Sequence, residues 1–437
     1  MHISGFRTIE QSQTLLLNEQ SRRLEHEGRE VFKFGFGQSP FPPLPAAVEA
    51  LRTHAGAKDY TPVQGLPALC ERVAAFHRAA EGLDTAPERV LVAPGSKLLL
   101  YAVMAAFIRA DVLIPAPAWV SYAPQARLLG HAAIPVFTGF EQRWRVTPQA
   151  LERALASKVD LQTPTLLVLN HPGNPDGLGY TEAELQALAP LLQRHEVLVI
   201  ADEIYGLLDH RGAHVSLAHH HPEGTIVTGG LSKWCGAGGW RLGVAMLPRA
   251  LGADFRQALL GIASETWSCT PLPVQHAACA AYEWNAEVRD YLAHQRRLLA
   301  HVGGWIAQRL QASGVRVHAP TGAFYLFPDF SGHAEALARS GIRSSRQLCE
   351  ALLRDAGVAL LPGDAFGMPP QALCARLAYV EFDGEAALAA SRRTGLASAL
   401  STLDQLALFG KSMRGIQRLT GWLDALVERY QPVQEQC

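Results

Sequence analysis

The stretch 228–243, "TGGLSKWCGAGGWRLG", holds a lysine in surroundings that favour chemistry. Lys233 follows a strand-like apolar run, with Ser232 before it and Arg241 eight positions after it. The glycines around it would let the backbone pack closely against a bulky group. A lysine held in a tight, partly dry place loses its proton readily and can act as a nucleophile. Lys233 is therefore the first candidate for a catalytic residue.

A carboxylate and a phenol follow another buried strand, "VLVIADEIY", which ends near Asp202 and Tyr205. An isolated aspartate at this place is usually a helix N-cap. A buried carboxylate, however, needs a cationic partner, and a protonated ring nitrogen would serve. In enzymes of pyridoxal 5'-phosphate (PLP) an aspartate commonly pairs with the pyridinium nitrogen while a lysine holds the aldehyde. Asp202 and Lys233 together indicate PLP, and Tyr205 could then reach the phenolic oxygen of the cofactor.

Two further sites suit the phosphate of such a cofactor. Gly95-Ser96-Lys97 opens a helix directly after a strand, where free backbone N–H groups favour an anion. A tight turn with an N-cap explains the same residues, and the backbone of Lys97 matters more than its charge. The guanidinium of Arg241 offers a fixed fork of donors to a phosphate ester, although a surface ion pair is the alternative.

Trp119 and Asn174 also stand at strand ends. The indole could stack on a flat ring or belong to the core. Asn174 could donate to a ring oxygen and to a substrate carboxylate, or only make an Asx turn. The run 219–221, three histidines, has the look of a metal site, but no suitably spaced carboxylate or cysteine pair accompanies it. We interpret that run as a solvated helix end and predict no metal.

The elements that must position these residues alternate between strand and helix. Apolar runs near 89–94, 111–117, 164–170, 196–205, 225–233 and 240–247 predict strands, with helices between several of them. One of these helices starts with the capping box of Thr181 and Glu184. This rhythm predicts an α/β fold with a mostly parallel sheet and helices on both faces. Ligands of such sheets bind at the carboxyl ends of the strands.

From about Glu283 the pattern changes to a long helix and then to "VRVHAP", "GAFYLFPDF" and "ARLAYVEF", which predict strands of a smaller α+β domain. We therefore expect three parts. Residues 1–45 form an N-terminal segment that joins the small domain. Residues 46–285 form the large PLP-binding domain, and residues 286–437 form a long connecting helix and the C-terminal small domain.

Net charge, apolar runs and cysteine spacing indicate which partners and which compartment to expect. The 437 residues carry a net charge of −1, which argues against nucleic acid or a polybasic membrane surface as the main partner. No apolar run is long enough to span a bilayer, and the start lacks the apolar core of a signal peptide. The seven cysteines are scattered without a C-x-x-C pair, so a reduced, cytoplasmic protein is the simplest expectation.

Taken together, the motifs resemble one family. "NHPGNPDG", "ADEIY", "LSKWCGAGGWRLG" and "ALLPGDAFG…ARLAYV", in this order, resemble the class I/II (fold type I) PLP-dependent aminotransferases. The resemblance covers nearly the whole chain, from "KFGFGQSPFPPLP" to about Asp383. It implies a fold type I architecture, transfer of an amino group between an α-amino acid and a 2-oxo acid, and a homodimer with shared active sites.

The resemblance also implies a role for each matching residue. For the cofactor it implies Lys233 as the Schiff-base lysine, Asp202 at the pyridine nitrogen, Tyr205 and Asn174 at the phenolic oxygen, Trp119 on the ring face, and Gly95, Ser96, Lys97, Ser232 and Arg241 at the phosphate. It implies that Tyr60 reaches the phosphate of the neighbouring subunit. For the substrate it implies Arg376 at the α-carboxylate, with Gly37 and Asn174 in contact.

Two departures from the family pattern bear on specificity. The usual Asn-Pro-Thr-Gly has Asp176 in place of the threonine. Relatives specific for dicarboxylates carry an arginine shortly before the segment that matches "TPLPVQ", whereas this chain has "ASETWSC" there, with Glu265 and no arginine. With Phe36, Phe41 and the "SYAP" turn expected at the entrance, we predict neutral or aromatic amino acids as substrates. Other fold type I activities (lyase, cyclase or oxidative) and a non-catalytic PLP-binding module are the alternatives.

Overall fold

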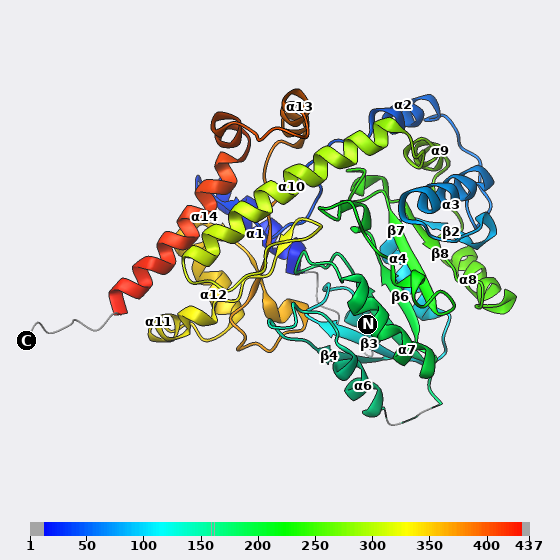
Figure 1. Ribbon diagram of the computed structural model, residues 1–437, viewed down its shortest axis with the longest axis horizontal. Helices are drawn as coiled ribbons and strands as arrows, with labels where there is room; N and C mark the ends of the chain where they lie inside the picture. Colours follow the sequence, from blue (N-terminus) through cyan, green and yellow to red (C-terminus); the bar gives the residue numbers. More distant parts are fainter. Residues whose placement is uncertain (1–12, 159, 161, 431–437) are drawn as a thin grey trace, which may run out of the picture.

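The structure is a computed structural model that describes residues 13–158, 160 and 162–430 (Figure 1). Seven of the described strands form the large sheet in the right half of Figure 1. From edge to edge they are β2 (Val90–Ala93), β8 (Gly243–Met246), β7 (Thr225–Gly230), β6 (Leu198–Asp202), β5 (Thr165–Asn170), β3 (Asp111–Ala116) and β4 (Ala132–Phe137). Neighbours from β7 to β4 pair in parallel, whereas β8 is antiparallel to both β7 and β2. The prediction of a mostly parallel sheet is confirmed.

Helices cover both faces of this sheet. Because successive side chains of a strand point to opposite faces, Leu166 and Val168 of β5 pack on one side and Leu167 and Leu169 on the other. The helices on the first side are α4 (Ser96–Ala105), α5 (Tyr122–Leu128) and α8 (Ala253–Thr266). Those on the second side are α6 (Pro148–Ala156) and α7 (Glu182–Arg194). The predicted α/β fold class is thus confirmed, and the expected capping box of Thr181 and Glu184 opens α7.

The long predicted helix is present as α10 (Ala286–Ala312), which crosses Figure 1 between the large sheet and the smaller part. In the smaller part, β11 (Leu361–Pro362), β12 (Ala375–Ala378) and β9 (Tyr325–Leu326) form an antiparallel sheet. The expected strand at "VRVHAP" is wrong. Only Arg316 in that stretch makes an isolated bridge, to Asp329. An apolar alternation of a few residues does not supply a pairing partner along its length.

Segments near the beginning and the end of the described chain lie together. β1 (Phe32–Lys33) pairs in parallel with β10 (Val358–Ala359), and the long helix α14 (Thr402–Tyr430) contacts both strands. The division into parts at residues 45 and 285 stays a prediction, and its outermost residues, 1–12 and 431–437, lie outside the described residues. No helix in the described part of the chain has the length and apolar character that a membrane crossing needs.

The remaining described elements connect these layers. The further helices are α1 (Gln13–His26), α2 (Pro45–Thr53), α3 (Pro67–Glu81), α9 (Leu272–Ala281), α11 (Ala334–Arg339), α12 (Ser345–Ala351) and α13 (Gly384–Thr394). Short 3-10 segments lie at Pro87–Arg89, Gly206–Leu208, Leu217–His219, Gly238–Trp240, Ser331–His333 and Gly363–Phe366, with a π-helical turn at Leu352–Ala356.

Candidate active site

The carboxyl ends of β5, β6 and β7 bring the candidate residues together. Asn170, the last residue of β5, pairs in register with Asp202, the last residue of β6, which pairs with Thr228 of β7. The amide of Asn170 donates to the Asp202 carbonyl at 2.6 Å and fixes the two strand ends to each other. Lys233 follows β7 after a short turn. Parallel strands therefore deliver the predicted carboxylate and lysine to one edge of the sheet.

Asp202 is buried, with 3% of its surface exposed, and its two carboxylate oxygens differ. Oδ2 accepts a hydrogen bond of 2.7 Å from the Tyr122 hydroxyl. Oδ1 has no hydrogen-bond partner among the described residues. Burial raises the pKa of Asp202 to about 6, although the Tyr122 hydroxyl, the Ile204 amide and the charge of Lys233 oppose this rise. A buried carboxylate oxygen without a partner is costly, so this atom is a ready acceptor for a positively charged N–H group.

Lys233 is partly buried, and aromatic rings surround its amine. The ammonium lies 5.5 Å from the ring centre of Tyr205 and 5.7 Å from that of Phe324. It donates to the carbonyl of Gly37 at 3.0 Å. Gly37 leaves no room for a side chain, because a Cβ there would collide with the hydroxyl of Tyr325. The predicted backbone contact of Gly37 is thus placed directly beside the predicted catalytic amine.

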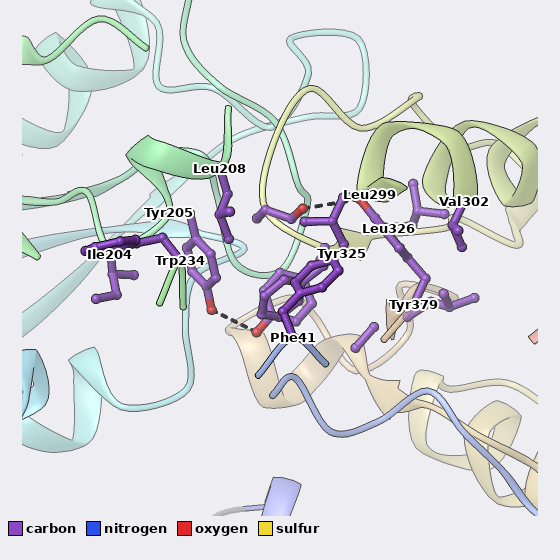
Figure 2. Close-up of a cluster of buried hydrophobic side chains, with 14 of the residues drawn as sticks. Phe41, Ile204, Tyr205, Leu208, Trp234, Leu299, Val302, Tyr325, Leu326 and Tyr379 are labelled. Atoms are coloured by element: carbon purple, nitrogen blue, oxygen red, sulfur yellow. Dashed lines mark hydrogen bonds between the residues drawn. The ribbon is translucent and has the colours of Figure 1, made fainter. Parts of the chain in front are cut away.

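The phenol of Tyr205 is fixed by a second phenol. Figure 2 shows its hydroxyl hydrogen-bonded to that of Tyr325, at 2.8 Å, within a buried hydrophobic cluster that includes Trp234 and Phe41. Burial raises the pKa of Tyr205, and the neighbouring Tyr325 adds to the rise. Tyr205 therefore stays a neutral hydrogen-bond donor on the side of Lys233.

An anion-binding corner lies at the N-terminus of α4. Gly95, the residue before the helix, has a φ of +96°, and a Cβ there would collide with the guanidinium of Arg241. Arg241 donates to the carbonyl of Gly238 at 2.9 Å. Neither Arg241 nor Lys97 has a carboxylate within 4 Å among the described residues. Two cations beside the free N–H groups of Ser96 and its neighbours suit a phosphate group.

A cavity of about 890 Å³ opens beside this corner. Lys97, Trp119 and Arg241 border it, and the Lys97 ammonium lies 4.9 Å from the ring centre of Trp119. Desolvation, together with the charges of Arg241 and Lys233, lowers the pKa of Lys97. The side chain of Lys97 thus faces the site, in addition to the backbone position that the sequence indicated. Ser232 is half-buried at the base of the Lys233 turn.

Arg376 is 2% exposed and reaches the site from β12. Its two terminal nitrogens donate to the amide oxygen of Asn174 at 2.9 Å and to the carbonyl of Gly35 at 2.6 Å. Its Nε has no partner among the described residues. Burial lowers the pKa of this guanidinium. The structure thus brings Arg376 and Asn174 into direct contact and leaves one buried donor of the arginine available.

The departure at Asp176 has a structural explanation. Its carboxylate, 5% exposed, pairs with Arg145 at 2.5 Å, and Arg145 is itself only 3% exposed. Asp176 also accepts from the amide of Leu178 at 2.8 Å. Burial raises the pKa of Asp176, and the charge of Arg145 opposes that rise. The extra negative charge is therefore neutralised inside the turn that carries Asn174.

Some residues singled out in the sequence lie elsewhere. Tyr60 is 91% exposed and does not border the cavity. Glu265 is exposed on α8 and does not border it either. Phe41 is buried in the cluster of Figure 2, with its ring against Phe382, and not at an entrance. In the histidine run, the His221 ring is buried and bonded to the Val197 carbonyl at 3.0 Å, so the interpretation as a solvated helix end is wrong for this residue.

Sequence reasoning missed two tyrosines of the site. Tyr122 was assigned to the entrance as part of "SYAP", yet its hydroxyl binds Asp202. Tyr325 binds Tyr205, and its ring lies 4.8 Å from the Arg376 guanidinium. Tyr122 begins α5 three residues after Trp119, a spacing that could have suggested a shared site. Tyr325 comes from the smaller part of the chain, and no local pattern connects it to Tyr205.

Comparisons with known proteins agree with this geometry. The model of the family "Aminotransferase class I and II" matches residues 29–381. An aspartate aminotransferase of Geobacillus stearothermophilus is 36% identical over 383 residues, which cover 84% of this chain and 91% of that protein.

Solved structures give the same result. An aspartate aminotransferase from Thermus thermophilus with maleate matches with a TM-score of 0.80 and 26% identity, and the match covers 96% of this chain and 100% of that one. An aromatic aminotransferase from Pyrococcus horikoshii matches with a TM-score of 0.76 and 25% identity, over 93% and 99% of the two chains. The chain belongs to the class I and II aminotransferases, a family of PLP-dependent transferases of nitrogenous groups.

Proposed function

We propose that this aminotransferase binds PLP with Lys233, Asp202 and the corner at Gly95 and Arg241. The observation that carries the proposal is the carboxylate of Asp202, which is buried and has one oxygen without a partner, at the same sheet edge as Lys233. The protonated ring nitrogen of PLP would supply that partner. Arg241 and the free N–H groups at the N-terminus of α4 would balance its phosphate, which leaves the ammonium of Lys97 for another role.

Within this site, PLP would supply an electron sink for the bond broken at the substrate Cα. Lys233 would hold the cofactor, and its amine, freed in a partly dry site, would move the Cα proton. Asp202 would keep a ring N–H protonated by accepting its hydrogen bond. Tyr205, held by Tyr325, and Asn174 would donate to the phenolic oxygen, and Trp119 would cover the ring face.

Arg376 would bind the α-carboxylate of the substrate. Its free Nε supports this role, because a carboxylate can accept from Nε and a terminal nitrogen together. Asn174, which already accepts from Arg376, would orient the guanidinium. If Arg376 binds the α-carboxylate, every substrate must carry a carboxylate at Cα, because the buried guanidinium otherwise keeps an unpaired donor.

We further propose an acidic amino acid, such as aspartate or glutamate, as the donor of the amino group. The ammonium of Lys97 borders the cavity and has no carboxylate neighbour among the described residues. The side-chain carboxylate of the substrate would form an ion pair with that ammonium. Relatives named aspartate aminotransferases are consistent with this choice. Glu265 does not border the cavity and would not repel an acidic side chain there, and Lys97 would supply the positive charge that the missing arginine supplies in relatives.

An aromatic amino acid, the substrate class that the sequence suggested, is the second candidate. Trp119, Phe137 and Phe366 border the same cavity, which at about 890 Å³ has room for a ring. The matching aromatic aminotransferase from Pyrococcus horikoshii is consistent with it. Lyase, cyclase or oxidative activities use the same lysine and cofactor, and a transamination assay separates them because they release products without an amino-group acceptor.

The cofactor is tested with the purified, PLP-reconstituted protein. We expect a yellow protein whose visible band is abolished by borohydride, with the label on the peptide that contains Lys233. Lys233→Ala should still bind PLP reversibly but should give no borohydride-stable label. A protein that never takes up PLP at saturating concentration contradicts the proposal.

The substrate is tested by measuring kcat/KM for aspartate, glutamate, phenylalanine and leucine with 2-oxoglutarate. Lys97→Gln should reduce kcat/KM for aspartate by roughly 10- to 100-fold, the effect of one lost charge-assisted hydrogen bond. The value for phenylalanine should change little. Arg194→Gln, which removes an exposed positive charge at the end of α7 and away from the cavity, is the control.

Three other results would change these assignments. An equal loss on every substrate, together with weaker PLP binding, assigns Lys97 to the phosphate, as the family resemblance implies. Higher kcat/KM for phenylalanine than for aspartate in the unmodified protein selects the aromatic candidate. Ammonia release without an oxo-acid acceptor contradicts transamination.

A further inference from the structure

A second set of polar side chains follows the same strand ends, one residue further along. His171 comes after Asn170 of β5, and Glu203 comes after Asp202 of β6. Successive residues of an extended chain point to opposite sides. Asn170 and Asp202 face the candidate active site, whereas His171 and Glu203 meet His214, from the loop after β6. None of these three residues has a part in the proposed catalysis.

The three side chains converge on one point. Their ligand atoms, two imidazole nitrogens and a carboxylate oxygen, all lie within 4.8 Å of one another. Nε2 of His214 lies 2.9 Å from Oε2 of Glu203, and Nε2 of His171 lies 3.7 Å from Oε1. The side chains are almost completely buried, with exposed fractions of 1% for His171, 3% for Glu203 and 5% for His214.

His171 is the residue that a hydrogen-bonded network does not explain. Neither of its ring nitrogens has a hydrogen-bond partner among the described residues. Its ring packs against that of His214, with centres 4.7 Å apart, and against Tyr180. Buried polar groups in native proteins are nearly always paired. Nε2 of His171 faces the carboxylate of Glu203 with the wrong spacing for a hydrogen bond but a suitable one for a shared cation.

We propose that His171, Glu203 and His214 bind a divalent metal ion, with Zn²⁺ as the best match. Two imidazoles and one carboxylate are a ligand set that zinc prefers. Zinc lies about 2.0–2.2 Å from such donors, and tetrahedral coordination then sets them roughly 3.4 Å apart. The distances from the imidazole nitrogens to the nearest oxygen of Glu203, 2.9 Å to Oε2 for His214 and 3.7 Å to Oε1 for His171, lie on either side of that value. The fourth position would be left to a water molecule.

The surroundings support a cation at this place. Ser216 donates to Oε1 of Glu203 at 2.7 Å and orients the carboxylate, as an outer-shell partner does at metal sites. The carboxylate of Glu81 and the ring of His214 both lie beside Gly206, since a Cβ built there would be about 3.0 Å from each. Glu81 is itself bonded to His77 at 2.5 Å. Glu81 thus places a second carboxylate near the three residues, in addition to that of Glu203.

A metal ion here would join the ends of β5 and β6 on the side opposite the candidate active site. Asn170 and Asp202 would then be held by the metal through their neighbours in sequence, in addition to the hydrogen bond between them. The metal is structural in this scheme and takes no part in the chemistry of Lys233. Metal content is therefore a readout that does not depend on activity or on the proposed function.

The test uses the full chain without an affinity tag, in buffer that contains PLP throughout. The protein is freed of metal with a chelator, dialysed against a small excess of ZnCl₂ and then against metal-free buffer, and its zinc is measured by atomic spectroscopy. We expect about one retained zinc per chain. His171→Ala and Glu203→Gln should each lower zinc affinity by at least tenfold. A double variant of the histidine run, His219→Ala with His220→Ala, should keep it, as should Lys233→Ala.

A second measurement keeps the test independent of variant folding. Replacement of zinc by Co²⁺ in the unmodified protein should give the visible bands of four-coordinate cobalt, at longer wavelength than PLP absorbs. X-ray absorption at the zinc edge should show two imidazole ligands. Absence of stoichiometric zinc overturns the proposal, and so does zinc that persists in His171→Ala but is lost in the His219/His220 variant.

Discussion

Arg145 and Asp176 are a pair of residues whose effect on the site is indirect. Both are almost fully buried, and their charges lie 2.5 Å apart next to the turn that carries Asn174. A buried charge that loses its partner is strongly destabilising, whereas replacement of both charges is often nearly neutral. The pair should therefore act as a unit.

Asp176→Asn alone should lower the free energy of unfolding by roughly 3–5 kcal/mol, because Arg145 is left unpaired. Arg145→Met alone should cost a similar amount, and the double variant should recover most of the loss. Urea denaturation of all four proteins measures this cycle. Additive losses in the double variant would contradict the pairing and assign each residue a separate role.

Tyr122 supports the charged form of Asp202 by a hydrogen bond of 2.7 Å. In Tyr122→Phe the carboxylate loses this bond, so its pKa rises and its attraction for a ring N–H weakens. We expect the dissociation constant of PLP to increase roughly 10- to 100-fold, the range for a hydrogen bond to a charged group. A spectrophotometric titration at pH 8 measures it. Tyr101→Phe, at another tyrosine that borders the cavity, is the control and should change little.

At the scale of elements, the contact between β8 and the start of α4 shapes the anion-binding corner. A Cβ at Gly243 would collide with the backbone N of Ser96 and would lie 2.8 Å from its Cα. Because backbone cannot yield like a flexible side chain, the strand and the helix would have to separate. The N–H groups at the start of α4 would then move away from Arg241.

Gly243→Ala should therefore weaken PLP binding at least tenfold and lower the melting temperature, since overpacking of a core contact costs about 1–3 kcal/mol. Gly239→Ala is the control. Gly239 precedes Gly243 by four residues, and a Cβ built on it has nothing within 4 Å. Retention of PLP after dialysis separates the two variants. Equal behaviour of both would show that the close approach of β8 and α4 is not needed.

How much the sequence could predict depends on the range of each interaction. The strands, the helix α7 with its capping box and the mostly parallel sheet follow from local periodicity and capping, and the structure has them. Lys233, Asp202 and Arg376 could be named because each stands in a short motif. Tyr325, Arg145 and the partner of Asp176 could not, because each contact joins residues that only the packed fold brings together. The predicted strand at "VRVHAP" is wrong because the apolar pattern of that stretch carries no information on a pairing partner.

At the scale of the whole molecule, the role of Tyr60 depends on whether two chains form a dimer. Its side chain is 91% exposed in the single chain, and Ile108 is fully exposed as well. Exposed aromatic residues are enriched at interfaces between proteins. A homodimer in which Tyr60 completes the neighbour's phosphate site remains our prediction from the family resemblance.

Light scattering should give a mass of about twice the 47.4 kDa of the chain. Lys233→Ala and Tyr60→Ala should each be nearly inactive as homodimers. After subunit exchange, the mixture should regain up to roughly a quarter of the normal activity, because one site of each hybrid has both residues intact. If exchange is shown by mass and no activity returns, Tyr60 does not act across the interface.

The helix α14 lies beyond the part of the chain that the family model matches, yet it supports the segment that reaches the site. Gly415 of α14 packs closely against Phe34, and Lys411 pairs at 2.6 Å with Glu381, which also accepts from the amide of Lys33. The next residues of that segment, Gly35 and Gly37, supply the carbonyls that accept from Arg376 and Lys233.

During synthesis, α14 leaves the ribosome after every residue of the candidate site. The segment around Gly35 and Gly37 has the pairing of β1 with β10 before α14 is made, and it gains the contacts of α14 only once that helix has docked. A chain cut short before residue 402 would therefore contain every residue of the candidate site and lack the support of α14 for the carbonyls that contact Arg376 and Lys233. We therefore expect the candidate site to reach its final geometry late in synthesis, after the last long helix has joined the fold.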